Sequence, residues 1–446
     1  MDINSHCKGT FESVGSTELQ NAGKAGLVQN QGKISAVLGT RMMEGRDGWA
    51  LKAPLDIKFL KGLENKSKLK KAIGLKDIEG KLKSINGHTF DDLEIQISKP
   101  RVKSIRTESG YLVDCVDINK QPAFDHPLLK NHTLQRKPSF ERNMNETSVK
   151  SSPNKLIYWL ENIRCPKGTV PIRRITKVDL IRGKSVFNDH NLIQSIMHEA
   201  YTYHEPPPDD IIHGIKGTTS IYNPKVDKDQ SSSGHLFVQD AFQKLIINGT
   251  NKIMVGWHVS PKLYNDDHST YFYSAWTSDN FKSTGCYNML CKGFVQIDRS
   301  YYLGSRIRKT STYGGEMIEM SISLNKDRTT HNWWLTVADK TIGYFPAALF
   351  PNMVEPSGVG WGGSTLSPMG TSSPSMGSGH LPDKDYVHAS YFRDIGIQVD
   401  DSGIYNQPSG DKYVDADAAS CYNVEYYGDQ GEEFGYSLQF GGPGCN

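Results

Sequence analysis

Apolar and polar residues alternate in short runs over the C-terminal half of the chain, from about residue 214 onward. Ile253–Val259 alternates apolar side chains with others, and Tyr271–Trp276 forms a second alternating set, as half-buried strands require. Similar runs recur roughly every 8 to 15 residues, between turns rich in Gly, Asn and Asp. This pattern predicts an all-β domain, built as an antiparallel β-sandwich of many short strands.

Ten further runs of the same kind complete the predicted strand set. They are Thr218–Tyr222, Gly234–Val238, Gly293–Ile297, Glu316–Leu324, Trp333–Val337, Ile342–Phe345, Val359–Trp361, Tyr391–Val399, Cys421–Tyr427 and Tyr436–Phe440. Asp339 and Lys340 separate two of these runs and indicate a hairpin. Residues 364–383 are rich in Ser, Gly and Pro and predict a long loop.

The chain before residue 214 has a different character. Residues 1–91 show little strand periodicity and are interpreted as a disordered or atypical extension; within them, a Lys-rich segment could instead be a basic helix on a membrane surface. Residues 92–182 predict a small α+β region with two strands and a short helix that begins after Thr176. Residues 183–213 are polar and Pro-rich, typical of an exposed linker, and residues 214–446 form the sandwich.

Charge and hydropathy limit the kinds of binding partner and cellular location that the sequence predicts. The 446 residues carry a net charge of +2, which gives no reason to expect a nucleic-acid or membrane partner, and no run of 18 apolar residues predicts a membrane span. Residues 1–14 have no basic start or apolar core, so the sequence as written shows no signal peptide. Seven Cys and four N-x-S/T sequons, at Asn65, Asn131, Asn145 and Asn248, nevertheless favour a glycoprotein of the secretory route. A different translation start site would reconcile the missing signal peptide with the Cys and sequon content.

Three groups of motifs resemble one family. The first is Asp114–His132 (D-C-V-D-I-N-K-Q-P-A-F-D-H-P-L-L-K-N-H), and the second is Cys165–Arg174 (C-P-K-G-T-V-P-I-R-R). The third comprises G-W-H-V-S-P-K-L-Y, T-G-C-Y-N-M-L-C-K-G-F-V-Q, S-T-Y-G-G, N-W-W-L, G-W-G-G, M-G-S-G-H and F-G-G-P-G, in this order after residue 255. Together they resemble the plant neprosin family over about residues 92–446. The first two motifs are similar to its activation peptide, and the third group is similar to its catalytic domain.

The resemblance implies a secreted zymogen with a β-sandwich peptidase domain that cleaves peptides after proline. It also implies a glutamic-type mechanism, in which two glutamates share one water. The ionised glutamate takes a proton from the water and the protonated one donates to the amide, because neighbouring carboxyl groups push their pKa values apart. No cofactor is implied, and the chain has no CxxC or HExxH spacing for a metal.

The two catalytic positions depart from the family pattern. One glutamate belongs in I-E-x-G-W, where this chain has Met254, and the other belongs in W-G-G-E, where it has Ser364. A thioether does not titrate, and a Ser hydroxyl needs an adjacent base. We therefore expect a degenerate, catalytically impaired protein that keeps a peptide-binding groove. The alternative is an active prolyl endopeptidase with a shifted carboxylate pair, for which Glu316 and Glu319 are candidates.

Further residues are assigned by the same resemblance. Trp257 and Trp361 are core residues by default, but in this fold they and Tyr313 are candidates to line the groove. His258, His268 and His380 are lone histidines and are expected to be surface or packing residues. Disulfides are expected at Cys286–Cys291 and Cys421–Cys445, with a third possible pair at Cys115–Cys165 that would leave Cys7 unpaired.

The expected partner is a peptide or protein, including Pro-containing sequences, bound by a monomer in an extracellular or vacuolar setting. Residues 92–182 are expected to be removed or displaced in the mature form; a permanent second domain is the alternative.

Overall fold

The structure is a computed structural model that describes residues 101–140, 158–191, 195–207, 210–240, 250–351, 353, 355–400, 403–408 and 411–445. The chain divides into two compact units, Met1–Ala72 and Ile73–Asn446, and every described residue belongs to the second. The extension predicted over residues 1–91 and the expected unpaired Cys7 therefore lie outside the described residues, as do three of the four sequons. Among the described residues, no helix is long and apolar enough to cross a membrane.

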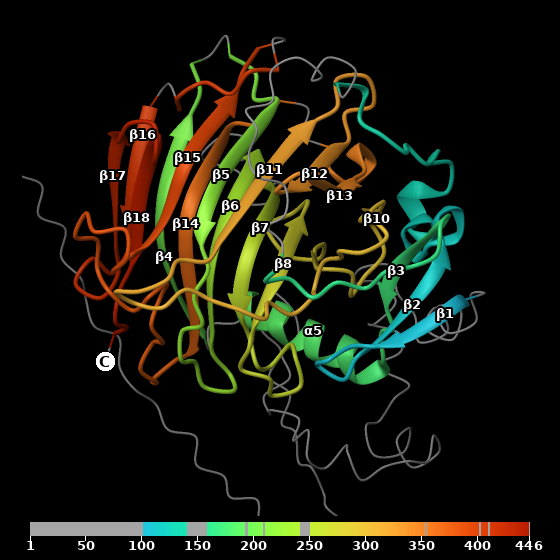
Figure 1. The fold of residues 1–446 in the computed structure, drawn as a ribbon, viewed down its shortest axis with the longest axis horizontal. Helices are drawn as coiled ribbons and strands as arrows, with labels where there is room; N and C mark the ends of the chain where they lie inside the picture. Colours follow the sequence, from blue (N-terminus) through green and yellow to red (C-terminus); the bar gives the residue numbers. More distant parts are fainter. Residues whose placement is uncertain are drawn as a thin grey trace, which may run out of the picture. The chain divides into compact units, whose positions relative to one another are not determined.

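Two large antiparallel sheets form most of the described structure (Figure 1). The first has eight strands in the order β10 (Val295–Gln296), β13 (Lys340–Phe345), β12 (Trp333–Val337), β11 (Glu319–Lys326), β5 (Gly214–Ser220), β15 (Ser390–Gln398), β18 (Tyr436–Gly441) and β17 (Asn423–Asp429). The second has seven strands in the order β16 (Asp411–Ala416), β4 (Ser195–Glu205), β14 (Gly358–Pro368), β6 (Ser231–Asp240), β7 (Asn251–Val259), β8 (Thr270–Thr277) and β9 (Cys286–Tyr287).

The main hydrophobic core lies between these two sheets. On β7 the side chains of Ile253, Val255 and Trp257 are fully buried in this core, and residues from β11 and β12 of the other sheet pack in the same cluster. The alternation read from the sequence therefore corresponds to one face of each strand turned toward the opposite sheet. The predicted antiparallel β-sandwich is confirmed.

A smaller unit of structure precedes the sandwich. Its sheet has the order β1 (Arg101–Arg106), β2 (Leu112–Asp117) and β3 (Thr169–Arg173), followed by the helix α5 (Lys177–Asn191). Short 3₁₀ helices are η1 (Ile118–Lys120), η2 (Pro122–Asp125), η3 (Pro127–Leu129) and, within the sandwich, η5 (Ala347–Leu349). The Thr176 hydroxyl accepts a hydrogen bond from the backbone N–H of Asp179, and the Asp179 carboxylate accepts one from the backbone N–H of Thr176. This reciprocal cap starts α5 where the sequence predicted, but the helix continues beyond the short one expected.

Residues 183–213 differ from the exposed linker that their composition suggested. They hold the end of α5 and the whole of β4, which pairs with β14 on one side and β16 on the other. The alternation was obscured because Thr202 and His204 occupy fully buried positions that are usually apolar. The proposed division into domains stays a prediction, but β4 is a strand of the seven-stranded sheet.

All three expected disulfides are present among the described residues. They join Cys115 to Cys165, Cys286 to Cys291 and Cys421 to Cys445. The first closes 50 residues within the small unit, and the other two lie within the sandwich. None of them links the two parts, so cleavage of the chain between α5 and β4 would leave no covalent bond across that break.

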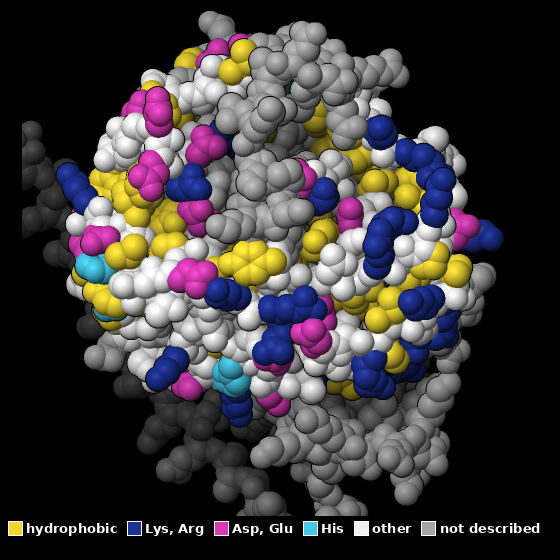
Figure 2. Space-filling model, viewed as in Figure 1, with side chains coloured by type: hydrophobic (Ala, Val, Ile, Leu, Met, Phe, Trp, Pro, Cys, Tyr) yellow, Lys and Arg dark blue, Asp and Glu magenta, His cyan; other side chains and the backbone are white. Residues whose placement is uncertain are grey.

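The small unit and the sandwich carry opposite charges. Residues 101–191 contain 17 Lys and Arg against 9 Asp and Glu, whereas residues 192–446 contain 18 against 28. Lys and Arg side chains gather over β1, β2 and β3 (Figure 2). Arg308 of the sandwich forms a two-point ion pair with Glu108. Opposite net charges favour association of the two parts at neutral pH.

Candidate functional site

Met254 and Ser364 line the same pocket on the outer face of the seven-stranded sheet. The pocket encloses about 110 Å³, which is room for one small side chain or a chain end rather than a peptide segment. Its floor is formed by strands β4, β14, β6, β7 and β8, which lie side by side in Figure 1. Val186 of α5 and Phe281 of the loop after β8 contribute to its walls.

Strand register fixes the relation between the two positions. Ser364 lies opposite Ser233 of β6, and Met254 lies opposite Phe237 of the same strand. They are therefore two strands apart and offset by four residues, a Cα separation of about 16 Å in a flat sheet with 3.3 Å per residue and 4.8 Å per strand. Only two long side chains directed toward each other could share one water across this distance. Ser364 is too short for that role.

His235 occupies the midpoint between these two positions. It lies on the central strand β6, two residues from Ser233 and two from Phe237. Its Nε2 shares a 2.7 Å hydrogen bond with the Tyr201 hydroxyl, and its Nδ1 shares one of 2.7 Å with the Tyr273 hydroxyl. The two tyrosines come from β4 and β8, on opposite sides of β6, so both ring nitrogens already have partners within the protein.

Two glycines make this row of side chains possible. Gly362 of β14 and Gly256 of β7 flank His235 on the neighbouring strands, so no side chain separates the imidazole from either tyrosine. A Cβ atom built on Gly256 would lie 2.0 Å from the backbone oxygen of Gly234, so no larger residue fits there. The sequence motif G-W thus contains a glycine that the site needs for close packing.

The serine hydroxyls form a short chain that leads to the same imidazole. Ser364 Oγ lies 2.9 Å from Ser233 Oγ, which in turn lies 3.3 Å from His235 Nδ1. This arrangement resembles a catalytic serine, here Ser364, that is linked through a second hydroxyl to a histidine base. The Tyr273 hydroxyl, however, is closer to Nδ1 than Ser233 is, and a neutral imidazole nitrogen has a single lone pair to offer.

Burial sets the protonation states of this row. It lowers the pKa of His235 well below its usual value, and it raises the pKa values of Tyr201 and Tyr273 well above theirs. His258, which stacks on Tyr273 at 4.2 Å, has its pKa lowered to about 3 by burial. These groups stay neutral at neutral pH, so none of them is an effective base for the Ser364 hydroxyl.

Two side chains of opposite charge also line the pocket. Glu199 lies directly opposite Ser364 on β4, and Lys252 lies two residues before Met254 on β7. The Lys252 ammonium is 3.9 Å from the centre of the Phe237 ring and 5.7 Å from that of Tyr201. Within the described part of the chain, neither the Glu199 carboxyl nor the Lys252 ammonium forms an ion pair.

Each of these two groups is shifted toward its neutral form. Burial raises the pKa of Glu199, and the charges of Asp415 and Asp417 act in the same direction, while Lys252 opposes them. Burial lowers the pKa of Lys252, with Glu199 acting in opposition. The pocket therefore holds one carboxyl group that protonates more readily than usual and one amine that loses its proton more readily than usual.

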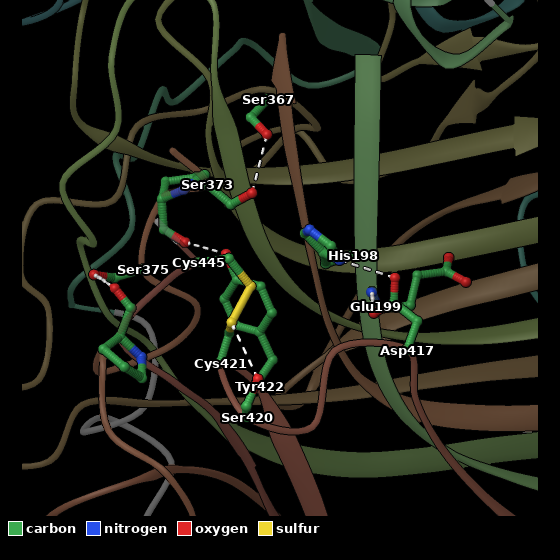
Figure 3. Close-up of a disulfide and its surroundings, with 12 residues drawn as sticks. His198, Glu199, Ser367, Ser373, Ser375, Asp417, Ser420, Cys421, Tyr422 and Cys445 are labelled. Atoms are coloured by element: carbon green, nitrogen blue, oxygen red, sulfur yellow. Dashed lines mark hydrogen bonds and ion pairs between the residues drawn. A yellow bond between two sulfur atoms is a disulfide. The ribbon is translucent and has the colours of Figure 1, made fainter. Parts of the chain in front are cut away.

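The C-terminal disulfide supports the strands near Glu199 (Figure 3). The Asp417 carboxylate accepts hydrogen bonds from the backbone N–H of Glu199 and from His198. Cys445 is tied through its backbone oxygen to the N–H of Ser373, in the segment that follows β14. The Cys421–Cys445 bridge thus joins the segment that follows Asp417 to a C-terminal segment that accepts a hydrogen bond from Ser373.

The groove-lining assignment of the tryptophans is corrected by the structure. Trp257 and Trp361 are fully buried between the two sheets, and their indole N–H groups donate to the backbone oxygens of Ser220 and Lys216 at 2.9 Å. They face away from the pocket because they lie at the alternate positions of β7 and β14. Tyr313 is half exposed and stacks on His380 and His388, away from the pocket.

The other acids and histidines named from the sequence lie elsewhere. The carboxylate of Glu319 is paired with Arg393 at 2.6 Å, and that of exposed Glu316 with Lys309 at 2.7 Å. Neither lines the pocket. His268 contacts the backbone oxygen of Val226 at 3.0 Å. Over the described residues, no group of three His, Cys, Asp or Glu side chains could hold a metal ion.

Sequence reasoning missed four of the charged or polar groups in the pocket. Lys252 was missed because the predicted strand began at Ile253, whereas β7 begins at Asn251 and places Lys252 on the same face as Met254. Ser233 and His235 alternate on β6, a signal for one common face that a search for known motifs does not use. Glu199 was missed because β4 itself was missed.

Comparison with known proteins finds two matching family models. The family model described as Neprosin matches residues 228–443, and the model described as Neprosin activation peptide matches residues 104–213. These two matches support a peptidase-like protein. Both models describe regions of neprosin-family proteins, which confirms the resemblance drawn from the motifs of this chain. The activation-peptide match runs through β4, so Glu199 and Tyr201 fall within it.

Two further similarities are limited in extent. A stretch of 32 residues is 91% identical to rhodanese-like domain-containing protein 9, chloroplastic, from Arabidopsis thaliana; it covers 7% of this chain and 14% of that protein. A solved structure of SCP-B, a member of the eqolisin family of peptidases in a complex with the tripeptide Ala-Ile-His, aligns with 55% of this chain and 97% of its own. Its TM-score is 0.23 at 8% identity, which is too low to support an argument.

Proposed function

We propose that this protein is a secreted, catalytically impaired neprosin-family member that binds peptides or protein segments, Pro-containing ones included, without hydrolysing them. The observation that carries the proposal is the pocket that Met254 and Ser364 line together with a neutral His235. The three disulfides among the described residues suit an extracellular or vacuolar setting. The protein is proposed to act as a monomer.

The loss of hydrolysis follows from the groups present. A glutamic-type mechanism needs one carboxylate to take a proton from water and one carboxylic acid to donate a proton to the leaving amide. Among the residues that the structure describes, one carboxyl group, that of Glu199, lines the pocket. The remaining hydroxyl and imidazole groups hydrogen bond with one another, and they provide no second group that titrates at the acid to neutral pH where such a pair would act.

Retention of binding follows from the pocket itself. Its lining combines hydroxyl, imidazole, amine and carboxyl groups with the apolar side chains of Met254, Phe281 and Leu366. A small pocket with a few converging polar groups is typical of a ligand site. We expect one residue of the peptide to enter the pocket, with the rest of the chain lying along the sheet.

This proposal is tested with a pair of matched substitutions. Ser364→Phe places an aromatic ring in the pocket, whereas Thr371→Phe adds the same ring at an exposed position after the same strand. Fluorescence anisotropy with a labelled Pro-containing peptide should show saturable binding to the unmodified chain and to Thr371→Phe. Ser364→Phe should weaken binding at least tenfold, about 1.4 kcal/mol. Equal binding by all three proteins, or none by the unmodified chain, would contradict the proposal.

The Glu199 carboxyl supports a second candidate function, hydrolysis by a shifted acid. It lies beside Ser364 and its pKa is raised, as a proton donor requires. Under this alternative Glu199→Gln would abolish a measurable cleavage activity. Under the main proposal, there is no activity for this substitution to remove.

We further propose that residues 92–182 are removed or displaced in the mature form, with β4 retained. Support comes from Val186, which places α5 against the pocket, and from the absence of a disulfide between the small unit and the sandwich among the described residues. The small unit is held by hydrogen bonds to Asp327: the Gln135 side chain donates at 2.7 Å and the Ser139 N–H at 2.6 Å.

Acid should loosen this attachment. Burial alone would raise the pKa of Asp327, but hydrogen bonds from Ser139, Thr330 and Gln135 outweigh it and lower the pKa below the usual value. A lowered folded-state pKa gives stability that is present above about pH 4 and is lost as the pH falls through the folded value. Asp327→Asn removes the charge at every pH and should cost about 1–3 kcal/mol, because its donors lose a charged acceptor.

Limited proteolysis measures this effect. Asp327→Asn should be cut within residues 101–140 at neutral pH at a rate that the unmodified chain reaches only in acid. Asp339→Asn, at an exposed hairpin position, is the control and should behave like the unmodified chain. Identical cleavage of Asp327→Asn and the unmodified chain at neutral pH would remove this account of the attachment. A mature protein whose N-terminus lies upstream of Asp114 would rule out the processing itself.

A further inference from the structure

We infer that the pocket selects peptide ligands that present a carboxylate, with Lys252 as the counter-ion. This inference rests on the proposed function and names the ligand chemistry of the same site. Three observations carry it: the position of Lys252, its lack of a partner charge, and the groups that surround it.

The position of Lys252 directs its charge into the pocket. Its backbone is on β7, next along the same face from Met254, and its ammonium lies over the Phe237 ring at 3.9 Å. The ring holds the charged end on the sheet surface, where it lines the pocket instead of extending into solvent. A ligand that enters the pocket therefore meets this ammonium.

The Lys252 ammonium has no direct ionic partner among the described residues, and the charge of Glu199 acts on its pKa without an ion pair between the two groups. No ion pair or hydrogen bond joins Lys252 to any described residue, and its contacts are with the rings of Phe237 and Tyr201. An ammonium placed in a confined site without a counter-ion is unfavourable, and an anionic ligand relieves that cost. A bound anion thus supplies the negative charge in contact with Lys252 that the described residues do not provide.

The surroundings favour a carboxylate over other groups. Tyr201 and Tyr273 present hydroxyls, and Ser233 and Ser364 present two more, so donors for two ligand oxygens lie in the same pocket. The one acid in the lining, Glu199, is half-buried and close to Asp415 and Asp417, which favour its protonated form. Because its pKa is raised, Glu199 repels a bound carboxylate less than an ordinary surface carboxylate would.

The volume limits where that carboxylate can come from. About 110 Å³ admits the end of a peptide chain or one acidic side chain, but not a folded acidic surface. A peptide ending in a free carboxylate and a peptide with an internal Glu share this chemistry. The experiment therefore includes one peptide of each kind.

The experiment compares three labelled peptides of otherwise identical sequence with the full chain at about pH 6, where a carboxylate and a Lys are both charged. One ends in proline with a free carboxylate, the second is its C-terminal amide, and the third is an amide with an internal Glu. The free acid, the Glu peptide or both should bind at least tenfold more tightly than the plain amide. Which of the two does so identifies the source of the carboxylate.

Substitutions assign the effect to Lys252. Lys252→Met keeps the apolar stem, and it should bind the carboxylate peptides and the plain amide about equally. Lys252→Gln serves as a second variant with the same expected result if Lys252→Met folds poorly. Lys228→Met, at an exposed position, should keep the full preference. Equal binding of all three peptides by the unmodified chain would overturn this inference and leave the proposed function intact. Failure of all three peptides to bind would overturn both.

Discussion

Replacing Met254 and Ser364 together by glutamate should give this protein a peptidase activity that it lacks. The double variant places two carboxyl-bearing side chains on the floor of one pocket, two strands and four residues apart. Both are longer than serine, so they can approach each other over His235 and share a water. Positioned acid–base groups contribute about 10²–10⁴-fold, and we expect cleavage of a Pro-containing peptide to rise over background by an amount in that range.

The controls separate charge from shape. Met254→Gln with Ser364→Gln has nearly the same size and hydrogen-bonding reach but does not titrate, and it should be as inactive as the unmodified chain. Either single glutamate should restore little, because neither places two carboxyl groups on opposite sides of His235: Met254→Glu lies three strands from Glu199, and Ser364→Glu lies beside Glu199 on the same side. Activity in the double Gln variant would show that reach, not ionisation, limits the reaction, and it would contradict this account.

Removing the Trp257 side chain should cause the largest loss of stability among the residues named here. Trp257 is fully buried between the sheets, and its indole N–H donates to the backbone oxygen of Ser220. Trp257→Ala removes that hydrogen bond and leaves a large cavity, which costs about 3–5 kcal/mol. Chemical denaturation at neutral pH measures the free energy of unfolding directly.

Tyr313→Ala is the matched control for this prediction. Tyr313 was expected to share the groove with Trp257, but its side chain is half exposed. Its removal should change the free energy of unfolding by less than about 1 kcal/mol, since exposed substitutions away from special features have small effects. If Trp257→Ala instead left stability unchanged and weakened peptide binding, the tryptophan would belong to the binding surface, against the structure.

Much of the sandwich could be predicted because its strands bury apolar residues on one face. Ile253–Val259 and Tyr271–Trp276 correspond closely to β7 and β8. The strand β14 was predicted to stop at Trp361, yet it continues to Pro368. Pairing with β4 on one side and β6 on the other keeps the Ser- and Thr-containing end of β14 in strand form, which composition alone does not reveal.

Two strands could not be predicted for related reasons. In β4, Thr202 and His204 take core positions that apolar residues normally fill, so the hydrophobic alternation is weak. In β16 the strand lies at the edge of its sheet, where residues such as Tyr413 and Val414 stay exposed and no buried face marks the sequence. The first was interpreted as part of a polar linker, and no strand was predicted at the second.

The pocket was only partly accessible from the sequence. Family motifs drew attention to Met254 and Ser364, and the structure brings both to one pocket although 110 positions separate them. Motifs could not show that Glu199, His235 and Lys252 join them, because that depends on which strands are neighbours and on their register. Trp257 and Trp361 illustrate the reverse case: a residue next to a motif glycine can face the opposite side of the sheet.

The most direct test of the central claim is an assay of the unmodified protein on a Pro-containing peptide. The purified full chain, and the chain after removal of its small unit by limited proteolysis, are incubated with the peptide over an acid to neutral pH series, and products are identified by mass spectrometry. We predict an intact peptide at every pH, even when anisotropy shows that it is bound. Cleavage after proline that resists serine, cysteine and metal inhibitors, and that Glu199→Gln abolishes, would contradict the claim and establish a shifted-acid peptidase.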